Sequence, residues 1–253
     1  MLDNMHDVTV VIDGVCNNQN NTNISVKYVD HTTLRQFGFT HLGKASKFKT
    51  CAFAYAIYLA CNSDDEYSWF IEDDVIFSSN NTIKKLDESI TADLLCRNHS
   101  HITESMDWLH WIEALHESPF ELGILHRSLQ CVCRCSKRLL DQIALMASSY
   151  KRLFYIEYIL NTICAKNNFT VVNPSCMQGI FYKPQQQIQL HGHEIIHPVK
   201  NEDERLKLMA FQKNNESNII ATKTNHTYIH VTYDYVMNKL VSSLLMKRIF
   251  QEW

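Results

Sequence analysis

Three adjacent acids, Glu72, Asp73 and Asp74, stand between two apolar runs at 69–71 and 75–77. Unpaired carboxylates in such surroundings repel one another and lose solvation, so they need a neutralising partner. A divalent cation supplies one, because Mg2+ and Mn2+ prefer hard oxygen ligands and bind substrate phosphates through one or two carboxylates. The triplet therefore predicts a metal site, with a solvated turn between two strands as the alternative.

A group of lysines precedes this acidic segment. Lys44, Lys47 and Lys49 fall in the first turns of a predicted helix at 44–61, where the helix dipole disfavours cations. A bound anion resolves this conflict, since the free N–H groups at a helix N-terminus also bind phosphate. The pattern fits a diphosphate held between the helix start and the metal, or a solvated lysine face.

Three histidines, His191, His193 and His197, follow much later in the chain. Isolated histidines are usually structural, but neutral imidazole is also a common metal ligand. His197 precedes Pro198 in a segment without a helical pattern. Of the three, it is the one that we expect to complete a metal shell from a loop.

Glu157 is the candidate general base. It lies within the apolar and aromatic segment 154–160, and such surroundings raise the pKa of a carboxyl group toward the range that suits proton transfer. The alternative is a structural acid hydrogen-bonded to a tyrosine or to Arg152.

The elements that must position these residues begin with short runs of β-branched or apolar residues. One run at 8–12 ends at Asp13, a second at 25–29 ends at Asp30, and a third at 69–71 ends at the acidic triplet. Strands that alternate with helices predict a mostly parallel sheet, in which ligands gather at the carboxyl ends of the strands. Asp13 and the triplet lie at such ends.

The second half of the chain has a different pattern. The alternating residues 131–135 predict a strand, Ser136 is a candidate helix cap, and 153–165 predicts a helix with Glu157 beside its apolar face. Trp and His rings at 108–111 are either a sugar-stacking platform or core. The tail at 233–253 predicts an amphipathic helix packed on the body.

Composition limits the class of protein. The 253 residues are 45% hydrophobic, enough for one large α/β domain, and the net charge of -3 gives no general attraction for nucleic acid or an anionic membrane. No apolar run reaches the length of a membrane span, and the first residues do not resemble a signal peptide. We expect a soluble cytoplasmic protein whose nine cysteines are thiols.

Residues 69–77 resemble the D-x-D strand of GT-A-fold glycosyltransferases, particularly the soluble enzymes of protists, algae and large algal DNA viruses. The acidic strand is the sharp part of the match. Other segments occur in the order expected for that family, after the lysine-bearing helix: 92–95, 135–140, 154–157 and 197–200.

The resemblance implies a GT-A-like, Rossmann-like fold: a mostly parallel central sheet flanked by helices, with a smaller acceptor-side region. It divides the single domain 1–253 into a nucleotide-sugar half at about 1–95, an acceptor and catalytic half at about 96–200, and a C-terminal strand and helix extension at about 201–253. The implied activity is transfer of a hexose or pentose from a UDP-sugar to a glycan, a glycoprotein or another hydroxyl acceptor, with Mn2+ or Mg2+.

The resemblance also implies roles for the acids. Asp74 would bind the metal directly, and Glu72, which replaces the first Asp of the motif, would act on the ribose or through a metal-bound water. Asp73 would lie beside the donor sugar, and His197 would complete the metal site.

Further positions match the family's donor and acceptor sites. Asp13 and Asp30 resemble nucleoside-contacting residues, and Lys49, with Lys44 as second choice, would contact the diphosphate. An inverting enzyme of this fold needs a carboxylate that deprotonates the acceptor hydroxyl, and Glu157 is the candidate, with Asp73 in reserve.

Two other classes remain open. A metal-dependent phosphoesterase or nuclease would use the same acids with His191 and His193, and water as its nucleophile. A non-catalytic nucleotide- or carbohydrate-binding module would keep the fold without the chemistry. Binding of an intact nucleotide-sugar with Mn2+ separates the transferase from a phosphoesterase, which would cleave generic phosphodiesters.

Overall fold

The structure is a computed structural model, and the part of the chain that it describes comprises residues 7–13, 25–40, 51–79, 81–108, 110–181, 194–199 and 226–233. Lys44, Lys47, Lys49, His191 and His193 lie outside these residues, as does the predicted C-terminal helix beyond Tyr233. The structure therefore leaves the predictions for those residues as predictions.

The larger sheet has the strand order β2-β1-β10-β3-β6-β5-β7. Its strands are β1 (Asp7–Asp13), β2 (Ser25–Tyr28), β3 (Tyr67–Glu72), β5 (Leu94–His101), β6 (His126–Ser136), β7 (Val171–Val172) and β10 (His226–Tyr233). β6 is antiparallel to both of its neighbours, and the other neighbouring pairs are parallel. The predicted α/β class is confirmed, with a sheet that contains both strand directions.

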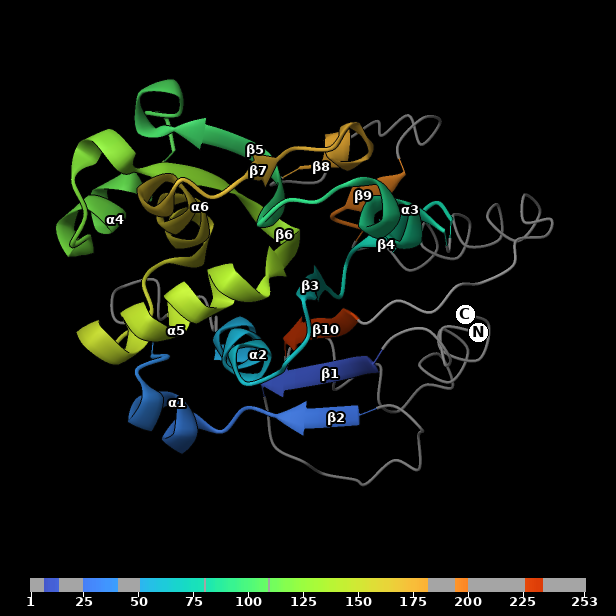
Figure 1. Cartoon of the computed structure of the whole chain (residues 1–253), viewed down its shortest axis with the longest axis horizontal. Coiled ribbons are helices and arrows are strands. Elements are labelled where there is room, and N and C mark those ends of the chain that lie inside the picture. The colour runs from blue at the N-terminus through green and yellow to red at the C-terminus, as the bar shows by residue number, and fades with distance from the viewer. Residues whose placement is uncertain are drawn as a thin grey trace.

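The position of β10 differs from the expectation. The sequence placed a C-terminal strand in an extension, whereas β10 pairs in parallel with both β1 and β3 and is an interior strand of the larger sheet (Figure 1). One strand thus separates Asp13, at the end of β1, from Glu72, at the end of β3. Because these strands are parallel, both carboxylates still lie at the same carboxyl edge.

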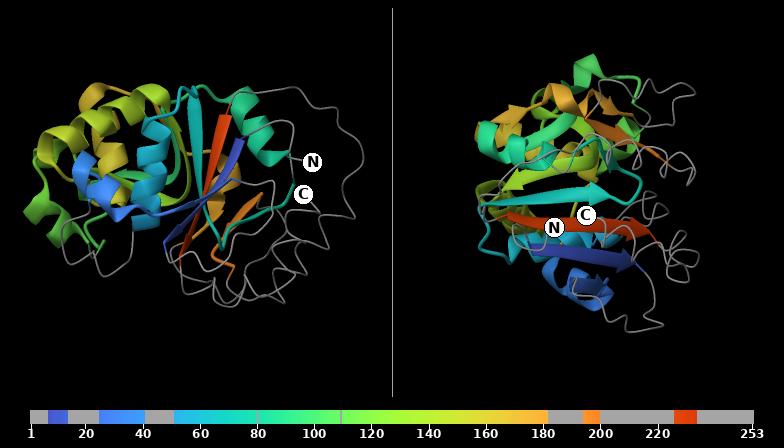
Figure 2. Two further views of the ribbon diagram at one scale, coloured as in Figure 1. Left: turned by 90° about the horizontal axis from the view of Figure 1, so that it is seen from below. Right: turned by 90° about the vertical axis from the view of Figure 1, so that its right-hand side faces the viewer.

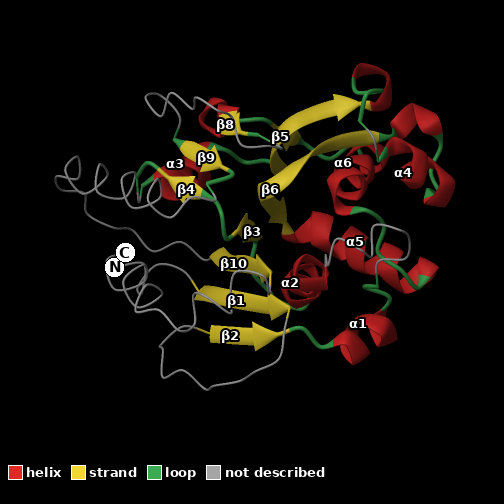
Figure 3. Ribbon diagram, turned by 180° about the vertical axis from the view of Figure 1, so that it is seen from behind, coloured by secondary structure: helices red, strands yellow, loops and turns green. Residues whose placement is uncertain are grey.

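Helices cover the two faces of the sheet unequally (Figures 1 and 2). The α-helices are α1 (His31–Phe37), α2 (Cys51–Cys61), α3 (Thr82–Ser89), α4 (Trp111–Glu117), α5 (Lys137–Tyr150) and α6 (Ile156–Asn167), and the 3-10 helices are η2 (Ile102–Glu104), η3 (Leu122–Ile124) and η4 (Ser175–Gln178). Helices α1, α2, α5 and α6 lie on one side, whereas α3 lies on the other (Figure 3).

The core follows from this layering. Successive side chains of a strand point to opposite faces, so Phe70 of β3 packs with the cluster formed by α2, α5 and α6, while Trp69 packs with Leu86 of α3. Both rings are fully buried. A strand buried on both faces needs a continuous apolar run, and residues 69–71 of β3 supply one directly before the acids.

Helix α5 begins as the sequence predicts. The Ser136 hydroxyl accepts a hydrogen bond from the Leu139 N–H, in the first turn of the helix, at 3.2 Å. Such a cap satisfies one of the free donors at a helix start. The buried residues Leu139, Leu140 and Ile143 then hold the helix against the sheet.

A second, smaller sheet has the order β4-β9-β8, built from β4 (Ile76–Phe77), β8 (Gly179–Ile180) and β9 (Ile195–His197). The predicted pattern of strand, acids and strand is confirmed, but β3 and β4 belong to different sheets. The acidic turn therefore joins the two sheets, and β9 reaches it from a distant part of the sequence.

Candidate metal centre

The acids occupy the end of β3 and the turn that follows it. Glu72 is the last residue of β3, Asp73 and Asp74 form the turn, and β4 begins at Ile76. The side chains of Glu72 and Asp74 are 24% and 20% exposed, so neither is fully solvated. This intermediate burial argues against the alternative of a freely solvated turn.

His197 faces two of these acids. Its Nε2 atom lies 3.2 Å from Glu72 Oε2 and 3.1 Å from Asp74 Oδ1, and the residue is only 5% exposed. Its other ring nitrogen, Nδ1, lies 2.8 Å from the backbone carbonyl of Phe181. Since a carbonyl oxygen only accepts, Nδ1 carries a proton, and Nε2 is the atom available to bind a cation between the carboxylates.

Backbone pairing in the smaller sheet sets this arrangement. Ile76 pairs with Ile196 in the antiparallel β4–β9 ladder, and the Val199 N–H donates to the Asp74 carbonyl at 2.8 Å. On the other side, the Phe181 N–H donates to the His197 carbonyl at 3.0 Å. The segment that carries His197 is thus fixed to the acidic turn on one side and to Phe181 on the other.

Cys131 of β6 is a further member of the cluster, and sequence reasoning missed it. One ligand atom each from Glu72, Cys131 and His197 lie within 4.8 Å of one another, and Cys131 is 8% exposed. Ile71 pairs with Val132 in the antiparallel β3–β6 ladder, so the next positions are Glu72 and Cys131. The alternating cysteines of 131–135 predicted the strand but did not indicate which thiol faces the acids.

The electrostatics of the cluster are dominated by negative charge. Burial by itself lowers the pKa of His197, but hydrogen bonds to Asp74, Cys131 and Glu72 outweigh it and raise the pKa to about 12. Burial, together with the charge of Glu72, raises the pKa of the Cys131 thiol to about 12. A centre that holds a proton on imidazole so strongly also favours a divalent cation in its place.

Glu157 lies in the first turn of α6. Burial raises its pKa to about 7, as its apolar surroundings led us to expect. The charge of Arg127 opposes this rise and the charge of Glu72 adds to it, which couples Glu157 electrostatically to the metal candidates. The charge of Arg127 acts on this carboxyl, and the Arg152 guanidinium lies 4.4 Å from the ring centroid of Phe154.

The aromatic segment beside Glu157 is mainly core. Trp108 and Trp111 are 9% and 4% exposed and pack edge to face, with centroids 4.9 Å apart. His110 and Tyr155 are partly exposed, and their rings stack at 5.3 Å. The core alternative therefore holds for the two tryptophans, and only the His110–Tyr155 pair of this segment presents ring surface outward.

The two predicted nucleoside contacts have local partners. Asp13, with a side chain 15% exposed, lies 3.6 Å from Nε2 of His31. Asp30 caps α1 by accepting hydrogen bonds from the N–H groups of Thr32 at 2.9 Å and Thr33 at 3.2 Å. Hydrogen bonds from Thr33 lower the pKa of Asp30. The sequence did not anticipate this structural role for Asp30.

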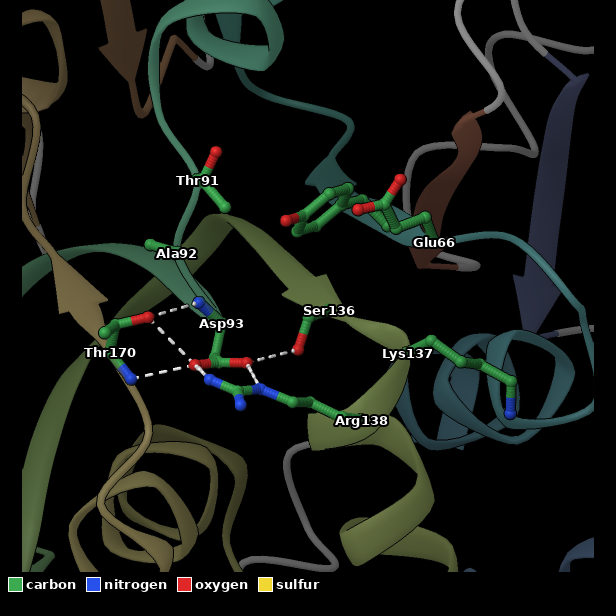
Figure 4. A pocket seen from close by; sticks show the side chains of 9 residues that line it. Glu66, Thr91, Ala92, Asp93, Ser136, Lys137, Arg138 and Thr170 are labelled. Atoms are coloured by element: carbon green, nitrogen blue, oxygen red, sulfur yellow. Dashed lines mark hydrogen bonds and ion pairs between the residues drawn. The ribbon is translucent and has the colours of Figure 1, made fainter.

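A pocket of about 410 Å³ opens at the opposite edge of the sheet, near the amino ends of β3 and β5 (Figure 4). At its base Asp93 accepts hydrogen bonds from the Ser136 hydroxyl, from Thr170 and from the Arg138 guanidinium. Burial alone raises the pKa of Asp93, but its bonds to Arg138 and Thr170 hold that pKa well below its usual range. Two of the segments that the resemblance singled out thus meet here, away from the acidic turn.

Three residues at the carboxyl edge offer atoms that could together hold a cation: a carboxylate of Glu72, the thiol of Cys131 and Nε2 of His197, with Asp74 Oδ1 3.1 Å from that nitrogen. Among the described residues, no helix is both long enough and apolar enough to cross a membrane. Searches of protein-family models and of curated proteins found no match to this chain.

Proposed function

We propose that this chain is a metal-dependent glycosyltransferase of GT-A-like fold that transfers a sugar from a UDP-sugar to a glycan or another hydroxyl acceptor. The observation that carries the proposal is the approach of His197 Nε2 to Glu72 at 3.2 Å and to Asp74 at 3.1 Å. This cluster lies at the carboxyl edge of the parallel strands, where α/β sheets bind their ligands.

Glu72, Asp74 and His197 would hold the cation, Mn2+ or Mg2+. When bound, it supplies charge neutralisation for the diphosphate leaving group. The protein contributes the orientation: the Phe181 carbonyl keeps the proton of His197 on Nδ1, and the end of β3 fixes the position of Glu72. Both contributions exist before any substrate binds, which lowers the cost of assembling the site.

Glu157 would take the proton of the acceptor hydroxyl. A carboxyl group with a pKa of about 7 is substantially ionised at neutral pH and is still basic enough to accept a proton in the transition state. Its coupling to Glu72 supports a position at the edge of the metal centre. Asp73, in the acidic turn, is the reserve base and the candidate contact for the donor sugar.

The donor would extend along the carboxyl edge from the acidic turn. Asp13 lies at that edge and is the better nucleoside contact, because the carboxylate of Asp30 already caps α1. Lys49, with Lys44 as second choice, would contact the diphosphate. These lysines remain predictions from the sequence.

Calorimetric titration with UDP and with GDP, each with and without Mn2+, tests the proposal. We expect UDP to bind only when Mn2+ is present, followed by binding of intact UDP-sugars. Cleavage of generic phosphodiesters without nucleotide-sugar binding would favour the phosphoesterase. Binding of nucleotide-sugar without transfer to any acceptor, and without hydrolysis, would favour a non-catalytic module.

A further inference from the structure

The proposed function assigns three ligands to the metal: Glu72, Asp74 and His197. The thiol of Cys131 lies beside them and has no role in that function. Cys131 contributes an Sγ atom within 4.8 Å of the ligand atoms of Glu72 and His197. Asp74 Oδ1 lies 3.1 Å from the same imidazole nitrogen. Two carboxylates and a thiol therefore converge on His197 from β3, the acidic turn and β6.

The position of Cys131 differs from that of its neighbours on the same strand. Cys133 and Cys135 are fully buried and belong to the apolar cluster that α2, α5 and α6 form with the sheet. Cys131 instead belongs to a different apolar cluster, at the end of β3 beside Glu72, and the charges of Glu72 and His197 act on its thiol. Only one thiol of this alternating run thus faces ligands that suit a cation.

The type of donor determines the preferred ion. Carboxylates alone suit Mg2+ and Mn2+, whereas thiolate selects softer ions, and a mixed set of Cys, His and carboxylate ligands is characteristic of Zn2+. We propose that Cys131 is a direct ligand of this centre, and that the centre consequently binds Zn2+ in preference to Mn2+ or Mg2+. The proposal rests on the metal site of the proposed function and does not depend on sugar transfer.

Binding is balanced by the release of two protons, one from the Cys131 thiol and one from Nε2 of the protonated His197 ring. The Cys131 thiol loses its proton to solvent as the sulfur–metal bond forms, and no electron is transferred. His197 binds through the lone pair that the departing proton leaves on Nε2, and it keeps the proton on Nδ1 against the Phe181 carbonyl. Glu72 binds as a carboxylate, so the three grouped ligands carry two negative charges around a doubly charged ion, and Asp74 Oδ1 lies 3.1 Å from the same imidazole nitrogen.

The full-length reduced protein, freed of metal, is titrated with Co2+ as a spectroscopic probe for Zn2+. We expect a thiolate-to-metal charge-transfer band that saturates at one equivalent and disappears when Zn2+ is added. Absence of that band in the wild-type protein overturns the proposal without the need for any variant. Saturation only after several equivalents overturns it as well, because scattered thiols would then be responsible.

Cys131→Ser and the matched control Cys133→Ser assign the band. Both replace a buried thiol of the same strand, but only Cys131 faces the acids. For Cys131→Ser we expect loss of the band and a fall in Zn2+ affinity of about tenfold or more, with a much smaller change in Mn2+ affinity. Cys133→Ser should keep the band. Equal losses of Zn2+ and Mn2+ affinity in Cys131→Ser would overturn the proposal.

The same samples separate this inference from the transferase. If the wild-type protein shows the band and prefers Zn2+ but binds no nucleotide with any cation, the thiol ligand stands and the transferase fails. If UDP binds with Mn2+ and the band is absent, the transferase stands and the thiol ligand fails.

Discussion

The two edges of the larger sheet each contain carboxylates, buried at one edge and partly buried at the other, but their partners differ. At the amino edge, Asp93 is surrounded by donors from Arg138, Ser136 and Thr170 (Figure 4). At the carboxyl edge, Glu72 and Asp74 share the single imidazole of His197. In the first cluster a guanidinium faces one carboxylate, whereas in the second two carboxylates face one imidazole.

The pKa shifts follow this difference. Hydrogen bonds hold the pKa of Asp93 below its usual range, so that acid is stabilised as a carboxylate. Burial raises the pKa of Glu157 to about 7, and the charge of Glu72 adds to the rise. A satisfied carboxylate holds elements together, and a carboxyl group with a raised pKa is available for proton transfer. The pocket at the amino edge is therefore a weaker guide to function than the acids around His197 and the raised pKa of Glu157 at the other edge.

The largest effect that we expect comes from removing a metal ligand. Asp74→Ala should abolish Mn2+-dependent UDP binding, because one of the two carboxylates facing His197 is lost. Calorimetry measures this directly, and circular dichroism checks that the fold is retained. Asp141→Ala, which removes an exposed acid of α5, is the matched control. Unchanged UDP affinity in Asp74→Ala would remove the metal centre from the proposal.

Removing the candidate base should have the next largest effect. Glu157→Gln keeps the shape of the side chain but cannot accept the acceptor's proton, so we expect kcat to fall by about 10²- to 10⁴-fold. Donor binding should remain close to wild type, since Glu157 is not a proposed metal ligand. Steady-state kinetics separate the two parameters. An unchanged kcat would transfer the role to Asp73.

At the amino edge we expect a change in stability and none in metal binding. Asp93→Asn weakens the charge-assisted hydrogen bonds of a buried carboxylate to a largely exposed arginine and should lower the free energy of unfolding by about 1–2 kcal/mol. Because the folded pKa of Asp93 is lowered, its contribution is present above its ordinary pKa of 3.8 and is lost as pH falls below that value toward the folded pKa. Urea unfolding at neutral and acid pH measures both effects. A loss of Mn2+-dependent UDP binding in this variant would contradict the contrast between the two edges.

The smallest effect concerns the titration of Glu157. In the metal-free protein we expect this carboxyl group to titrate near pH 7. A cation bound at Glu72 offsets the negative charge that raises this pKa, so Mn2+ or Zn2+ should shift the titration to lower pH by about one unit or more. Carbonyl-region infrared spectroscopy of wild type against Glu157→Gln detects the change. A titration that does not move with metal would place Glu157 away from the centre.

Local chemistry explains what the sequence by itself determined. The apolar run before Glu72 predicts a buried strand that ends in acids, Ser136 predicts the start of α5, and the aromatic surroundings of Glu157 predict its raised pKa. Each of these features depends on residues that are close together in the sequence, within one strand or about two turns of a helix. Residue periodicity and helix capping are patterns on this scale.

Only the tertiary structure decided which residues share the metal centre. The β4–β9 ladder brings His197 to Asp74, and the antiparallel register of β3 and β6 brings Cys131 to Glu72. The tertiary structure also shows that Asp30 caps α1 and that β10 is an interior strand of the larger sheet. Strand register and sheet order depend on contacts between segments far apart in the chain, and residue spacing carries no direct signal for them.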